Sequence, residues 1–189
     1  MIRKTHLIYS AGLVLAVAAC SSSTDVSTSL SQSAASKLAA DMDALSSSGA
    51  ADVALGATGT NTFTVTKQCP KGGQIALAGT IVRTGDPTTH SLTVDATATR
   101  TDTGCAFDTD DGVLTLTGNI DYTGHLNIVN GALSGLQTQT HNGSFTWSRP
   151  GGSGTCVVDH LISQYDPTTH TATVTGTVCG KTINVTRTR

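Results

Sequence analysis

The histidines are the residues of this chain best suited to acid–base or metal chemistry. Beyond residue 20 there are five of them: His90, His125, His141, His160 and His170. They form no H-x-H, H-x-x-x-H or H-E-x-x-H pattern, and all thirteen acidic residues are Asp, so the chain lacks the usual zinc-hydrolase ligand set. His90 and His170 end two matching turns, and pseudo-symmetry could bring them together at a metal. Polarity at the edge of a turn explains them more simply.

Two short segments could bind a calcium ion or hold a nucleophile. Residues 108–112 (Asp-Thr-Asp-Asp-Gly) cluster carboxylates, but they lack the spaced ligands and the bidentate Glu of a calcium loop. Their Asp-Gly step indicates a hairpin turn, with weak calcium binding as the alternative. Residues 151–154 place Ser153 among glycines without the spacing of a nucleophile elbow, which favours a flexible loop. The sequence therefore predicts no catalytic residue, no metal ligand and no cofactor.

A repeated pentapeptide marks two turns. Asp-Pro-Thr-Thr-His occupies residues 86–90 and again residues 166–170. Asp at the first position and Pro at the second favour a type I turn, because Pro presets the required φ and Asp hydrogen-bonds to the backbone. Each copy joins two strand-like runs that are flanked by cysteines. The repeat therefore predicts two hairpins and suggests a duplicated unit.

The register of these hairpins predicts how the cysteines pair. If Asp166 faces Thr169, the two C-terminal cysteines lie opposite one another, at a separation that a disulfide bridges. Counting along the strands from the first copy of the turn in the same way leaves Cys69 and Cys105 one residue short of lying opposite each other. A single bulge would correct that offset. Of the three possible pairings we predict the bonds Cys69–Cys105 and Cys156–Cys179. They would leave no thiol nucleophile and indicate an oxidising compartment; without a C-x-x-C pair, a four-cysteine metal site is the weaker alternative.

Antiparallel strands are the elements that must carry these cysteines. From residue 59 onward aliphatic residues alternate with Thr, Asp or Asn, a period of two. The clearest runs are 62–66, 92–99, 171–178 and 182–186, and further strand candidates are 74–84, 113–122, 135–140, 144–149 and 157–165. No second helical segment separates them, which excludes a parallel βαβ topology. Residues 59–189 are therefore predicted to form a mainly β domain, an antiparallel meander that makes a curled sheet or a small barrel, with Phe145 and Trp147 in its core.

Residues 20–58 are predicted to tether this domain and to add one short helix. Residues 21–28 are rich in Ser and Thr and of low complexity, which is typical of a disordered spacer. Lys37, Asp41 and Asp43 lie mostly off the apolar stripe that follows, and Gly49 and Gly56 mark the break before the strands. The stripe predicts a helix that caps the open end of the β domain, and its residues are Leu30, Ala34, Leu38, Met42 and Leu45.

The first 20 residues have the features of an export signal. Arg3 and Lys4 precede an apolar run over residues 7–17, which is too short to span a bilayer. The sequence Val-Ala-Ala-Cys at residues 17–20 resembles the lipobox of bacterial lipoproteins. The resemblance implies cleavage after residue 19, a diacylglyceryl thioether on Cys20 and acylation of the new amino terminus. An ordinary cleaved signal peptide is the alternative. In lipoproteins of Gram-negative bacteria, Asp directly after the lipidated Cys favours retention in the inner membrane. Ser21 at that position therefore implies the outer membrane.

Composition and charge narrow the function of the mature chain. Without residues 1–19 it has nine basic and thirteen acidic residues, a net charge of −4, which opposes nucleic-acid binding. We expect a lipid-anchored envelope protein with a non-enzymatic structural or binding role, its membrane contact made through the anchor. The alternative is a carrier or sensor of a small apolar ligand, in a barrel hollowed by small residues such as Ala76, Ala78, Gly79, Ala96, Ala98 and Gly176. A hydrolase is less favoured, because it needs a Ser or Asp within reach of a His in a cleft.

Overall fold

The protein is described by a computed structural model that covers residues 29–54, 56–86 and 88–188, without the side chains of residues 51 and 53. The lipobox, Cys20 and Ser21 lie outside the described residues, as does the predicted spacer over residues 21–28. Within the described ranges the chain forms one helix and nine strands, so the prediction of a mainly β fold is confirmed.

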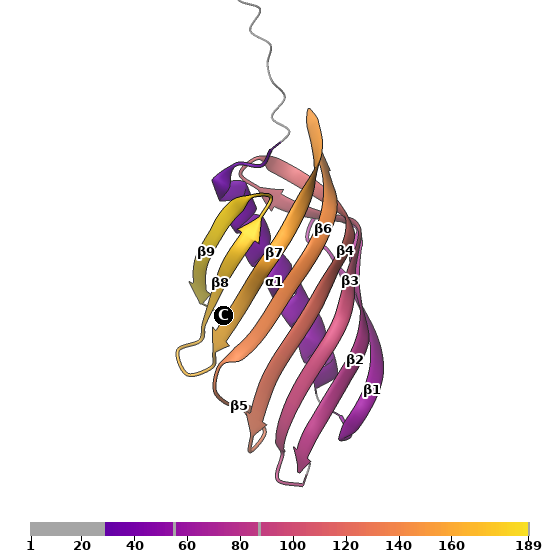
Figure 1. Cartoon of the computed structure of the whole chain (residues 1–189), viewed down its shortest axis with the longest axis vertical. Coiled ribbons are helices and arrows are strands. Elements are labelled where there is room, and N and C mark those ends of the chain that lie inside the picture. Colours follow the sequence, from indigo (N-terminus) through magenta and orange to yellow (C-terminus); the bar gives the residue numbers. More distant parts are fainter. Residues whose placement is uncertain (1–28, 55, 87, 189) are drawn as a thin grey trace, which may run out of the picture.

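The nine strands form a single antiparallel sheet that curls around one helix (Figure 1). Along the sheet the order is β1-β2-β3-β4-β6-β7-β8-β9, and β5 pairs with β4. Since β1 and β9 are the two edges, the sheet is open, and of the two predicted forms the curled sheet is the one observed. The strands are β1 (Gly59–Gln68), β2 (Gln74–Asp86), β3 (Ser91–Thr109), β4 (Gly112–Val129), β5 (Ala132–Leu133), β6 (Gln137–Arg149), β7 (Gly152–Asp166), β8 (Thr171–Val178) and β9 (Lys181–Thr188).

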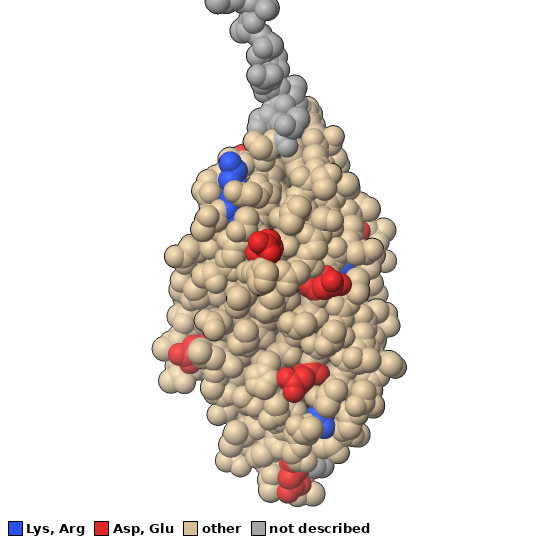
Figure 2. Space-filling model, viewed as in Figure 1, with Lys and Arg blue, Asp and Glu red and all other residues tan. Residues whose placement is uncertain are grey.

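Alternating aliphatic and polar residues give the sheet one buried and one wet face. On β2 the residues Ile75, Leu77 and Ile81 are almost fully buried, while their neighbours are largely exposed. Phe145 and Trp147 are each 2% exposed, as predicted for core residues. On the face drawn in Figure 2, Asp side chains lie apart from one another and most of the surface is uncharged. The prediction was wrong for Ala76 and Ala78, because their position in the alternation points them away from the concave face.

The helix α1 (Gln32–Ala54) lies against the concave face and crosses it diagonally (Figure 1). The hydroxyl of Ser31 accepts a hydrogen bond from the amide of Ala34 and so caps its first turn. The predicted stripe packs inward, with Leu38 and Met42 fully buried. The helix thus fills the curl of the sheet and does not cap an open end. Within the described part of the chain, no helix has both the length and the apolar character needed to cross a bilayer.

The helix also runs past Gly49, where the sequence predicted a break. A Cβ atom at this position would lie 2.7 Å from Cδ1 of Leu77, so a larger residue would push α1 away from β2. Gly49 therefore allows close packing of helix and sheet in place of ending the helix. The salt bridge between Lys67 and Asp52, with its charged atoms 2.6 Å apart, attaches the same end of α1 to β1.

Both predicted disulfides are present in the structure. Cys69 is bonded to Cys105 with Cα atoms 5.4 Å apart, and Cys156 is bonded to Cys179 with Cα atoms 4.4 Å apart. The first joins the β1–β2 turn to β3, and the second joins β7 to the β8–β9 turn. Each bond therefore holds a turn against the strand beside it at the same end of the sheet.

The register behind that prediction was wrong by two residues at the turns. Asp166 pairs with Thr171 and not with Thr169, because the left-handed His170 (φ 55°) extends the loop. The first copy of the turn is built alike, since Asp86 pairs with Ser91. In both copies the Asp carboxylate accepts a hydrogen bond of 2.8 Å from the amide two residues later.

A bulge in β7 brings Cys156 and Cys179 back within bonding distance. In β7 an irregularity at Asp159 and His160 shifts the pairing with both β6 and β8, and His160 has a φ of 45°. It leaves the amide of Cys179 bonded to the carbonyl of Val157, next to Cys156. In the β2–β3 hairpin the pairing runs without a shift from Asp86–Ser91 to Gln74–Thr103, so the single bulge that the sequence predicted there is absent. The register shift at Gly104, directly before Cys105, lies between β3 and β4, and Cys69 reaches Cys105 from the β1–β2 turn.

Candidate functional site

Small residues hollow the concave face at one end of the sheet. Ladder pairing sets Ile81, Ala96 and Gly124 side by side across β2, β3 and β4. The adjoining row holds Gly79 beside Ala98. The ring of Tyr122 covers Gly124, where a Cβ atom would lie 2.6 Å from the tyrosine oxygen. Alanine at position 96 fills little of the space beneath α1, so a gap is left beside this ring.

That gap is a pocket of about 330 Å³ between the C-terminal half of α1 and the sheet. It lies at the end of the sheet that carries the β4–β5 turn, and residues of β2, β3, β4, β6 and β7 also line it. The opposite end is closed, since the start of α1 is bonded there through the amide of Ser31 to the carboxylate of Asp111. The volume of the pocket falls within the range of small-molecule sites in proteins.

The pocket has one aliphatic wall and one polar wall. The aliphatic wall comes mainly from β2, β3 and β4 and includes Ile81, Val94, Leu126 and Ile128. The polar wall comes from α1, β6 and β7 and includes Ser47, Gln137, Gln139 and Tyr165. In the described part of the chain, His125 is the only lining residue that can carry a positive charge, and no Asp lines the pocket.

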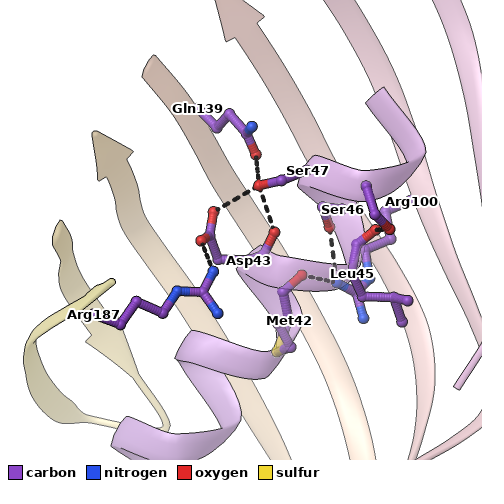
Figure 3. Close-up of polar contacts among 9 residues, drawn as sticks. Met42, Asp43, Leu45, Ser46, Ser47, Arg100, Gln139 and Arg187 are labelled. Atoms are coloured by element: carbon purple, nitrogen blue, oxygen red, sulfur yellow. Dashed lines mark hydrogen bonds and ion pairs between the residues drawn. The ribbon is translucent and has the colours of Figure 1, made fainter. Parts of the chain in front are cut away.

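A fully buried arginine fastens α1 to the sheet beside this pocket (Figure 3). Arg100 of β3 forms a two-pronged ion pair with Asp102, whose oxygens lie 3.0 and 2.7 Å from Nε and Nη2. Its Nη1 donates to the carbonyl of Met42 at 2.8 Å and to the hydroxyl of Ser46 at 2.9 Å. A guanidinium satisfied in this planar geometry is tolerated in a core that would reject an unpaired charge.

Asp43 fastens the opposite side of the helix. Its side chain is fully buried and pairs with Arg187 of β9. One turn later, the hydroxyl of Ser47 donates to the carbonyl of Asp43 at 2.7 Å and contacts Oε1 of Gln139 at 3.1 Å (Figure 3). Charged groups of β3 and β9 therefore clamp α1 from both sides, and Ser47 connects this clamp to the pocket.

A buried imidazole lies on the concave face of the sheet, near the charged groups of the clamp. His141 of β6 is fully buried, and within the described part of the chain neither of its ring nitrogens has a hydrogen-bond partner. Its ring meets the edge of the Tyr122 ring at a centroid distance of 5.4 Å. Burial lowers the pKa of His141 to about 4, and the positive charge of Arg100 acts in the same direction while Asp43 acts against it. The imidazole is therefore neutral at pH 7.

The remaining histidines are not brought together into one site. His90 and His170 occupy equivalent left-handed positions in the two repeated turns. His125 holds Asp95 through Nδ1 at 2.7 Å and contacts Asn127 through Nε2 at 3.3 Å. Both of its nitrogens thus contact side chains at an exposed site, and among the described residues neither contacts a serine hydroxyl. Across the described residues, His, Cys and Asp side chains form no group of three that could hold a metal ion.

Two other predicted sites have structural roles. Asp110 and Asp111 form the turn between β3 and β4, as the Asp-Gly step indicated. The carboxylate of Asp111 also pairs with Arg149 at 2.8 Å, and it accepts the bond from the Ser31 amide. Ser153 lies in β7, paired with Ser148 of β6, so the expected flexible loop is instead the start of a strand.

Sequence reasoning missed the clamp. Arg100 and Asp102 continue the inward positions of Val94, Ala96 and Ala98, so the period of two placed both charges on the buried face. Asp43 was placed off the apolar stripe of the helix, yet its side chain is fully buried because the sheet curls around the helix. The pattern that could have predicted the clamp is a pair of opposite charges two residues apart at inward positions of one strand. Two such buried charges indicate an ion pair, because an unpaired buried charge is strongly destabilising.

Comparison of the chain with family models, with curated proteins and with solved structures found no match. The case for its function therefore depends on its own residues.

The clamp predicts a large effect of Arg100→Ala on stability. The substitution leaves Asp102 charged and buried, so we expect the free energy of unfolding to fall by roughly 3–5 kcal/mol in urea titrations. The double variant Arg100→Met/Asp102→Leu removes both charges and should recover most of that loss. Lys37→Ala removes the exposed pair with Asp41 and an exposed bond to the carbonyl of Asp108, and it should cost less than about 1 kcal/mol. A loss for Arg100→Ala no larger than that for Lys37→Ala would contradict the clamp.

His141 predicts loss of stability on mild acidification. Its folded pKa lies below the ordinary value of 6.5, so the unfolded chain binds the proton first and stability falls as the pH drops below 6.5. Between pH 7 and pH 5 this group should remove about 2 kcal/mol from the free energy of unfolding. His141→Phe should abolish that part of the pH dependence, whereas the exposed control His125→Gln should keep it. An unchanged pH profile in His141→Phe would show that His141 is not the group responsible.

Proposed function

We propose that this chain is a lipid-anchored protein of the bacterial cell envelope whose β domain binds a small apolar ligand without catalysing a reaction. The observation that carries the proposal is the pocket of about 330 Å³ beneath the C-terminal half of α1. Its main wall is aliphatic, and burying apolar ligand surface there contributes about 25 cal/mol for each Å² removed from water. The sequence suggested a ligand inside a closed barrel; the proposal now concerns the gap between an open sheet and its helix.

The clamp supports a pocket that exists before the ligand arrives. Arg100 and Asp43 fix the middle of α1, so the helix cannot settle into the hollow above Ala96 without breaking the bonds of Arg100 to α1 and the buried ion pair of Asp43 with Arg187. Preformed sites do not spend binding energy on ordering the protein, which favours affinity. The neutral state of His141 at pH 7 keeps a further charge out of this layer.

The anchor is proposed from the amino-terminal residues. Residues 1–20 have the head, the core and the lipobox of a bacterial lipoprotein, and Ser21 favours the outer membrane. Two disulfides are compatible with an oxidising compartment outside the inner membrane. Eight residues lie between Cys20 and residue 29, so this connection spans at most about 30 Å. The net charge of −4 makes nucleic acid an unfavourable partner.

Filling the pocket should abolish ligand binding. In Ala96→Phe the new ring occupies the hollow between Ile81 and Gly124, so we expect the affinity for the apolar fluorescent probe N-phenylnaphthylamine to fall at least about tenfold. The matched control is Thr97→Phe, which places the same ring on the exposed face of the same strand. Fluorescence titration measures both affinities, with thermal melting as the check on folding. Lack of saturable probe binding by the unmodified protein, or equal binding by Ala96→Phe, would contradict the proposal.

Lipidation should depend on Cys20. Mass spectrometry of protein extracted from bacterial membranes should find an acylated peptide that begins at Cys20, because two or more acyl chains give lasting attachment. Cys20→Ser should move the protein to the soluble fraction, while the control Ser21→Ala should stay membrane-bound. A Cys20→Ser protein that fractionates with membranes as completely as the original would rule out this anchor.

A further inference from the structure

The polar wall of the pocket includes an amide donor, Nε2 of Gln139, that no other described residue uses. Oε1 of Gln139 lies 3.1 Å from the hydroxyl of Ser47, so one end of the Gln139 amide faces α1 and the other end is Nε2 (Figure 3). Its Nε2 has no hydrogen-bond partner in the described part of the chain, although Gln139 lines the pocket. The neighbouring Gln137 differs, because its Nε2 already donates to the carbonyls of Ser134 and Gly135.

Charge is nearly absent from the rest of the lining. The ionic groups beside the pocket are paired and do not line it: Arg100 pairs with Asp102 of the same strand, and Asp43 pairs with Arg187 of β9. His125 is held by Asp95. A ligand carboxylate or ammonium inside the pocket would lose its hydration and gain no opposite charge, which is strongly unfavourable. A carbonyl or hydroxyl oxygen would lose little hydration free energy and would accept a hydrogen bond from Nε2 of Gln139.

We infer that the pocket takes an uncharged amphiphile, with its hydrocarbon part against the aliphatic wall and one accepting oxygen bonded to Nε2 of Gln139. Fatty alcohols and acyl esters or amides have this chemistry; free fatty acids and alkyl amines do not. The inference rests on the proposed binding function and specifies its ligand class. It also places the polar group of the ligand inside the pocket, on the β6 side, and leaves the aliphatic residues of β2, β3 and β4 to contact the chain.

The rim of the pocket suits entry of such a molecule. Residues 126–137, which run from β4 through β5 to the start of β6, contain no charged residue. Three of them expose apolar side chains at this end of the sheet: Val129 is 47% exposed, Leu133 44% and Leu136 53%. Leu133 also lines the pocket, so the apolar rim and the pocket are continuous. A charged headgroup would find no ionic partner among residues 126–137.

Three ligands of equal chain length test the inference on the unmodified full-length protein. Octanol, octanoate and octylamine are titrated at pH 7.5 against bound N-phenylnaphthylamine, and displacement of the probe gives the three affinities. Octanol should bind at least about tenfold more tightly than either charged analogue. Octanoate or octylamine binding as tightly as octanol would overturn the inference while leaving the proposed function intact. Failure of all three to displace a probe that does bind in the pocket would overturn the inference as well.

Substitution of Gln139 tests where the oxygen is held. Gln139→Leu removes the donor and keeps a side chain of similar size, so the affinity for octanol should fall by about three- to tenfold with little change for octanoate. Thr140→Val is the matched control on the other face of β6 and should leave both affinities unchanged. Equal octanol binding by Gln139→Leu and by the unmodified protein would contradict the assigned contact, and the ligand comparison above does not depend on how well this variant folds.

Discussion

The interaction on which the rest of the structure depends is the buried ion pair of Arg100 and Asp102, together with the two bonds that Arg100 gives to α1. An open sheet cannot bury its concave face against itself, so the face needs a second element. A helix with alanines and a few large aliphatic residues offers limited apolar area for that purpose. The directional bonds of Arg100, and of Arg187 on the opposite side, fix where and at what angle the helix lies.

This placement divides the concave face into a filled half and a hollow half. Toward the β3–β4 turn, large side chains such as Phe107, Leu116 and Trp147 pack beneath α1. Toward the β4–β5 turn, Ala96 leaves the gap that forms the pocket. Both disulfides lie in the filled half, because each joins a turn to a strand at that end of the sheet. The hollow half is thus supported by a cross-linked core without being part of it.

Much of this fold was predictable from the sequence, because alternation and turn chemistry are local. The strands and their antiparallel order followed from the period of two, and the disulfides followed from hairpins that the repeated turn defined. The turn register was wrong because a left-handed residue at His170 lengthens the loop, a choice that no residue pattern forces. The helix position, and with it the burial of Asp43, depends on contacts far apart in the chain. The pocket could not be derived, since it is the space that those contacts leave empty.

Hydrogen–deuterium exchange along α1 is the measurement that tests this account most directly. If the hydrogen bonds of Arg100 and the buried ion pair of Asp43 with Arg187 fasten the helix into the sheet, the amides of residues 38–49 open only when the whole domain unfolds. They should then exchange as slowly as the central amides of β3 and β4, in protein that carries no ligand. Exchange in α1 that is many times faster than in those strands would show a loosely docked helix, and it would remove the basis for a preformed pocket.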